Sequence, residues 1–144
     1  MSNLIFFVTV TSLFAVFMVQ AALPPSEFGP QIQALQGNLH SLCISQSGTD
    51  EASIANVING VFIDEPKIKF YMKCLFTEAK VINEHGDFNG ERITQLLPDK
   101  IKKESLVVIN GCIAKINDIA NLEDKTFSFF KCYHNENPNL FIFF

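Results

Sequence analysis

Apolar residues recur at intervals of three and four along most of the chain after residue 22, a spacing typical of amphipathic α-helices. The clearest stripe surrounds Cys74 and consists of Ile68, Met72, Leu75, Phe76, Ala79 and Ile82. Asp64 is a suitable N-cap for this helix, and Pro66 suits its first turn. We therefore expect Cys74 to lie on a rigid helix that packs one face into a core.

Five further segments have helical character, and loops rich in Gly, Asn and Asp separate them. We expect Pro98 to end the fourth helix and Asn121 to cap the sixth. With the helix of Cys74, the predicted helices cover residues 26–43, 52–59, 91–97 and 99–116 and a segment that begins after Asn121. The pattern therefore predicts an all-α fold, a compact bundle of about six helices.

Residues 1–21 have the features of a secretory signal peptide. Leu4 to Val19 is uncharged and largely apolar, and the small-residue pattern Val19-Gln20-Ala21 follows it. A membrane anchor is the alternative, but these sixteen residues are fewer than the roughly 20 that span a bilayer, and Pro24-Pro25 follow at once. We expect cleavage after Ala21, a secreted protein without stable membrane insertion, and one helical domain over residues 22–144.

Four cysteines follow the predicted signal peptide: Cys43, Cys74, Cys112 and Cys132. An even number of cysteines in a secreted chain indicates two disulfides, for which three pairings are possible. A metal site is the alternative, because His40 and His134 each lie close in sequence to a cysteine. Structural zinc sites favour Cys-x-x-Cys pairs, which this sequence lacks, so we expect disulfides and no metal.

Charge and motifs exclude several classes of function for this chain. The formal net charge is −4 and no basic stripe is present, so nucleic acid and anionic membranes are unsuitable partners. The hydrolase motifs Gly-x-Ser-x-Gly and His-Glu-x-x-His are absent from the sequence. Catalysis by a free thiol is disfavoured when all four cysteines are expected in disulfides. We expect a binding protein and not an enzyme, with no cofactor.

The C-terminal residues Leu140-Phe141-Ile142-Phe143-Phe144 form a short apolar tail after Asn137-Pro138. Five residues are too few for a stable helix, and burying such a side chain is worth about 1.5–3 kcal/mol. We therefore expect the tail to lie against the domain or inside it.

Three cysteine-containing segments together resemble insect odorant-binding proteins of the pheromone- and general-odorant-binding superfamily. They are Phe70-Tyr71-Met72-Lys73-Cys74, Gly111-Cys112, and Phe130-Lys131-Cys132-Tyr133 with Asn137-Pro138 following. The family usually has six cysteines, and in this chain the second falls on Phe70 and the fifth on Glu123. Because those two cysteines pair in the family, their joint absence removes one whole bridge. The chain thus resembles the four-cysteine, or C-minus, branch.

This resemblance implies disulfides Cys43–Cys74 and Cys112–Cys132, which would join the first helix to the third and the fifth to the sixth. It implies that the helices surround an internal apolar pocket. The missing bridge predicts a looser junction between the third helix and the start of the sixth.

The implied function is extracellular binding and transport of small hydrophobic ligands, such as odorants, pheromones or fatty-acid-like molecules, through aqueous lymph. The alternative is a non-olfactory carrier or scavenger of lipids or amines in haemolymph, saliva, gut or reproductive fluid. A small secreted hydrolase is the disfavoured third class. A chemosensory receptor is a candidate partner, and we expect a monomer or a weak dimer.

Large apolar side chains near the bridged cysteines are the candidates for lining the pocket, because helix residues three or four apart point roughly the same way. Ordinary core packing is the competing interpretation. The candidates are Met72, Phe76, Leu96, Ile109, Ile113, Phe127 and Phe130, with Phe141 and Phe143 of the tail as one wall. His40, His85 and His134 are candidates for acid-triggered release, although solvated surface histidines are the simpler interpretation.

Overall fold

The computed structural model describes residues 22–144, which form six α-helices and two 3₁₀ turns, Pro25–Glu27 and Pro138–Leu140. The predicted signal peptide, residues 1–21, lies outside the described residues. Within residues 22–144 the only extended pairing is one isolated bridge between Ile82 and Phe88, so the all-α prediction is confirmed. The helices are α1 (Gly29–Ser47), α2 (Glu51–Ile58), α3 (Pro66–Glu78), α4 (Gly90–Leu96), α5 (Lys102–Lys115) and α6 (Leu122–Glu136).

Side-chain caps define where three of these helices begin. Asp50 before α2, Asn89 before α4 and Asn121 before α6 each accept a hydrogen bond from the backbone N–H three residues further on. Such a cap satisfies one of the free N–H groups of the first turn and is worth about 1 kcal/mol. The prediction that Asn121 caps the sixth helix is confirmed.

Several helix boundaries differ from the prediction, and α5 begins at Lys102 and not at residue 99. The first helix begins at Gly29 and continues to Ser47, four residues beyond the expected end at Cys43. Gly48 stops it because its φ of +66° is left-handed, a conformation that glycine adopts without strain. At α3 the N-cap residue is Glu65 and not Asp64.

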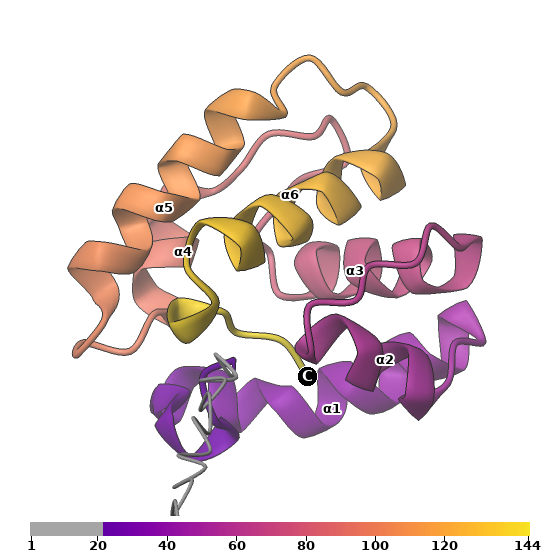
Figure 1. Cartoon of the computed structure of the whole chain (residues 1–144), viewed down its shortest axis with the longest axis horizontal. Coiled ribbons are helices and arrows are strands. Elements are labelled where there is room, and N and C mark those ends of the chain that lie inside the picture. Colours follow the sequence, from indigo (N-terminus) through magenta and orange to yellow (C-terminus); the bar gives the residue numbers. More distant parts are fainter. Residues whose placement is uncertain (1–21) are drawn as a thin grey trace, which may run out of the picture.

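Figure 1 shows α6 crossing the middle of the molecule, with α3 and α1 on one side and α5 on the other. The main packing pairs are α1 with α3, α3 with α6 and α5 with α6. The C-terminal tail turns back from the end of α6 toward α1 (Figure 1). Among residues 22–144, no helix combines the length and the apolar character that crossing a membrane requires.

Two disulfides fasten the helix pairs together. Cys43–Cys74 joins α1 to α3, and Cys112–Cys132 joins α5 to α6, which is the pairing that the resemblance implies. They close loops of 31 and 20 residues, so each contributes about 3–4 kcal/mol on the loop-entropy model. Because all four cysteines are bonded, a thiolate-ligated metal site is excluded.

The apolar tail is buried in the domain, as the sequence predicts. Leu140, Phe141, Ile142 and Phe143 are all buried, and Phe141 is completely inaccessible. The backbone N–H of Leu23 donates to the carbonyl oxygen of Phe141 at 3.0 Å, which ties the tail to the start of the described chain. Most of the tail is therefore part of the core.

The two positions that lack cysteines, Phe70 and Glu123, both contact Lys73. Its Nζ lies 2.7 Å from Oε1 of Glu123 and 4.2 Å from the centre of the Phe70 ring. One turn earlier on α3, Lys69 Nζ lies 2.8 Å from Oδ1 of Asp124. We call the Phe70, Lys73 and Glu123 contacts the Lys73 clamp. This clamp joins α3 to the start of α6 where the family's third bridge would lie.

Candidate functional site

An apolar cavity lies within the bundle, among α1, α3, α4, α5, α6 and the tail. Its volume is about 110 Å³. Tyr133 is the only lining residue with a polar side-chain atom. The lining residues are Ile32, Leu35, Leu39, Leu75, Phe76, Ala79, Val81, Ile93, Leu96, Leu97, Ile109, Phe129, Phe130, Tyr133, Ile142, Phe143 and Phe144.

Helical periodicity explains which residues reach the cavity. On α1 the lining residues Ile32, Leu35 and Leu39 are three and four positions apart, so they form one stripe. The two disulfides join α1 to α3 and α5 to α6, and all four helices contribute to the wall. The covalent framework of the fold therefore fixes most of the cavity wall.

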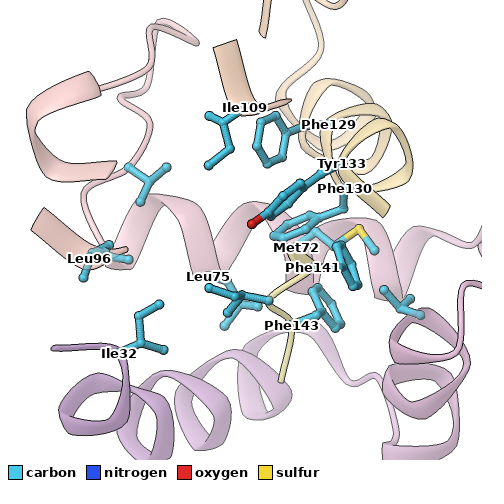
Figure 2. Packing of buried hydrophobic residues seen from close by; sticks show 14 of the residues in the cluster. Ile32, Met72, Leu75, Leu96, Ile109, Phe129, Phe130, Tyr133, Phe141 and Phe143 are labelled. Atoms are coloured by element: carbon cyan, nitrogen blue, oxygen red, sulfur yellow. The ribbon is translucent and has the colours of Figure 1, made fainter. Parts of the chain in front are cut away.

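Five of the nine predicted ligand-binding residues line the cavity. They come from five different parts of the fold and are Phe76, Leu96, Ile109, Phe130 and Phe143. Figure 2 shows four of them, Leu96, Ile109, Phe130 and Phe143, around the interior of the bundle. Contact between these side chains and a ligand stays a prediction.

The other four predicted residues, Met72, Ile113, Phe127 and Phe141, are not among those that line the cavity. The first three each lie one helical turn, about 5.4 Å, from a residue of the same helix that does line it. Each points in the same direction as that lining residue but lies at a different position along the helix axis. Met72 and Phe141 are completely buried, so they serve the core.

The lining residues that were not predicted include the α1 wall and the tyrosine of α6. Ile32, Leu35 and Leu39 belong to an apolar stripe that is visible in the sequence, and Tyr133 directly follows a bridged cysteine. The stripe marks the inward face of α1, but it does not tell whether that face meets side chains or open space.

Tyr133 provides the polar part of the cavity wall. Its hydroxyl donates a hydrogen bond to the carbonyl oxygen of Leu140 at 2.5 Å. Burial raises the pKa of Tyr133 to about 12, and the neighbouring Ser105 hydroxyl acts in the opposite direction. The phenol is thus protonated at neutral pH. Figure 2 shows its oxygen pointing away from α6 toward the interior.

The end of the tail is held by a chain of side-chain contacts that begins on α2. Glu51 Oε1 lies 2.9 Å from Nε2 of His40, and Nδ1 of His40 lies 2.8 Å from the Tyr71 hydroxyl. That hydroxyl donates to the main-chain oxygen of Phe144 at 2.5 Å. This chain of contacts links the end of the tail to α3, α1 and α2.

His134 packs edge-on against two aromatic rings. Its ring centre lies 5.0 Å from that of Phe141 and 5.8 Å from that of Phe62. Desolvation in this setting lowers the pKa of His134 below its usual value, because burial disfavours the imidazolium.

Comparison with known proteins identifies relatives of this chain. The model of the PBP/GOBP family matches residues 25–136. Odorant-binding protein 10 of Aedes aegypti is 29% identical over 120 residues, covering 77% of this chain and 76% of the relative.

Solved structures show the same fold. An odorant-binding protein of Locusta migratoria superposes with a TM-score of 0.70 at 21% identity, over 78% of this chain and 86% of that one. Odorant-binding protein 7 of Anopheles gambiae, solved in complex with an azo compound, gives 0.65 at 23% identity, over 77% and 89% of the two chains.

Proposed function

This chain belongs to the PBP/GOBP family of odorant-binding proteins, and we propose that it binds small apolar molecules in the described cavity and carries them through an extracellular fluid. Family and fold support binding of small hydrophobic ligands. The signal-like N-terminus and the two disulfides support an oxidising, extracellular site of action.

The composition of the cavity wall carries the proposal. An apolar ligand that leaves water for such a site gains about 25 cal/mol for each Å² of apolar surface buried. The residues that line the cavity include no Ser, Cys, His, Lys, Asp or Glu, so it offers no nucleophile paired with a base. The wall therefore supports binding over hydrolysis.

The size of the cavity favours compact ligands. An engineered apolar cavity of about 150 Å³ in another protein holds one benzene molecule, and the volume here is about 110 Å³. A longer ligand needs additional space. The tail residues Ile142, Phe143 and Phe144 form the C-terminal part of the wall outside the helices, where Ala79, Val81 and Leu97 also line it. We infer that the tail is the wall that moves when a larger molecule binds.

Displacement of an environment-sensitive fluorescent probe tests the proposal directly. A panel of volatile compounds and fatty acids, graded by size, competes with the probe at neutral and at acid pH. Compact apolar compounds should displace it best. Failure of every apolar compound to displace the probe would overturn the proposed function.

A matched pair of substitutions on α5 locates the site. Ile109 lines the cavity, whereas Ile113 is the same residue type one turn further on and does not line it. We expect Ile109→Ala to weaken the binding of compact ligands and Ile113→Ala to leave it unchanged. Equal effects would place the ligand somewhere else.

A further inference from the structure

The Tyr133 hydroxyl, the only polar side-chain group in the cavity wall, has an unused capacity to accept a hydrogen bond. Its proton is committed to the carbonyl oxygen of Leu140, 2.5 Å away. A phenol oxygen can accept as well as donate. Among residues 22–144 no group donates a hydrogen bond to this oxygen, and the neighbouring Ser105 hydroxyl makes none at all. The cavity therefore contains one acceptor without a donor.

The direction of the phenol makes this acceptor available inside the cavity. Figure 2 shows its oxygen directed from α6 into the space between Ile109, Leu96 and Leu75, which belong to α5, α4 and α3. All three of these residues line the cavity, and their side chains are apolar. Because Tyr133 is buried and bonded to Leu140, its oxygen is already held in one place before a ligand arrives.

We propose that the Tyr133 hydroxyl oxygen accepts a hydrogen bond from the ligand, so that the cavity selects compact apolar molecules that carry a hydroxyl group. This inference names the ligand class of the proposed function and rests on that function, because it requires a ligand in the cavity.

The hydrogen-bonding capacity of the ligand decides how well it matches this wall. An alcohol can donate its proton to the phenol oxygen and so recovers one of the hydrogen bonds that it leaves in water. A ketone has no proton to donate, and its carbonyl oxygen meets no free side-chain donor because the Tyr133 proton is bonded to Leu140. A hydrocarbon has no polar group to satisfy. The wall therefore favours a hydrogen-bond donor over an acceptor of the same shape.

The test compares Tyr133→Phe with the parent protein in the probe-displacement assay. The ligands are cyclohexanol, cyclohexanone and methylcyclohexane, and each ligand is compared with itself, so the cost of its leaving water cancels. We expect the affinity for the alcohol, relative to the ketone and to the hydrocarbon, to fall about five-fold, the factor that one hydrogen bond of ordinary net strength contributes. The freed carbonyl oxygen of Leu140 does not replace the acceptor, since Leu140 does not line the cavity.

Tyr71→Phe is the matched control. The Tyr71 hydroxyl donates to the main-chain oxygen of Phe144 at 2.5 Å, but Tyr71 does not line the cavity. Both substitutions therefore remove one hydrogen bond to the tail, and both should lower Tm. Only Tyr133→Phe removes an oxygen from the cavity wall. We expect Tyr71→Phe to change the affinities for the three ligands by a common factor, which leaves their ratios at the parent values.

A measurement on the parent protein keeps the inference testable if Tyr133→Phe does not fold. The Kd of each ligand is compared with the partitioning of that ligand from water into an alkane, a solvent that offers no hydrogen bond. Relative to its own partitioning, cyclohexanol should bind about five-fold more tightly than cyclohexanone. Equal values for the two would refute a hydrogen bond from the ligand to Tyr133.

The outcomes separate this inference from the function on which it rests. If Tyr133→Phe leaves the ratio of alcohol to ketone affinity unchanged, the proposed acceptor is refuted while the carrier function stands. The same holds if Tyr71→Phe lowers that ratio as much, because the effect would then come from the tail. If no apolar compound displaces the probe from the parent protein, both proposals fall.

Discussion

The Lys73 clamp should hold α3 to the start of α6 in place of a disulfide. The side chains of Lys73 and Glu123 are 24% and 32% exposed, so their ion pair is partly desolvated and worth about 0.5–1 kcal/mol. The cation–π contact with Phe70 adds about 0.5–1 kcal/mol. Lys73→Met keeps the aliphatic part of the side chain, so we expect it to lower the free energy of unfolding by about 1–2 kcal/mol.

Urea unfolding with a double-mutant cycle measures the pair itself. The cycle combines Lys73→Met with Glu123→Gln, and we expect a coupling energy of about 0.5–1 kcal/mol at low salt. In about 1 M salt the Debye length falls to about 3 Å, so the coupling should fall by at least half. Hydrogen exchange should also show faster exchange of residues 121–125 in Lys73→Met.

The pair of Lys100 and Glu27 supplies the control. Its atoms are 3.3 Å apart and the Lys100 side chain is 81% exposed, so the corresponding cycle should give a coupling close to zero. A coupling for Lys73 and Glu123 no larger than this control, or one that salt leaves unchanged, would refute the clamp. The junction would then be as loose as the missing bridge predicts.

The tail, the half-buried His134 and the second disulfide provide further tests. Phe143→Ala and Phe141→Ala should each cost about 3 kcal/mol or more in urea unfolding, but only Phe143 lines the cavity, so only its loss should favour larger ligands in the displacement assay. Equal shifts in ligand size would contradict a tail wall. The lowered pKa of His134 means that the unfolded chain binds its proton more readily, so stability should fall as the pH drops below about 6.5. Unfolding at about pH 7.5 and about pH 5.5 should show a smaller loss in His134→Gln, and an equal loss would exclude His134 as the cause. Replacing Cys112 and Cys132 by Ser should lower stability by about 3 kcal/mol, and a thermal scan showing no change would contradict the assigned bridge.

Part of the candidate site was predictable because helix spacing and cysteine position are local properties of the sequence. Phe76 lies two residues from bridged Cys74, and Phe130 lies two from bridged Cys132, so both are held near the centre of the bundle. Ile109 was predicted by the same reasoning. That reasoning did not distinguish Ile109, which lines the cavity, from Ile113, which does not. Two residues one turn apart have the same periodicity, and only their place along the helix axis distinguishes cavity from core.

The sequence by itself determined the six helices, the Asn121 cap and the burial of the apolar tail, because turn residues, caps and apolar spacing act over a few residues. Through its spacing of cysteines it also indicated the family and the absent bridge between the positions of Phe70 and Glu123. Only the tertiary structure decided that Lys73 joins those two positions and that α1 lines the cavity. Each of these features brings together side chains from segments far apart in the chain, and their meeting depends on how the helices pack.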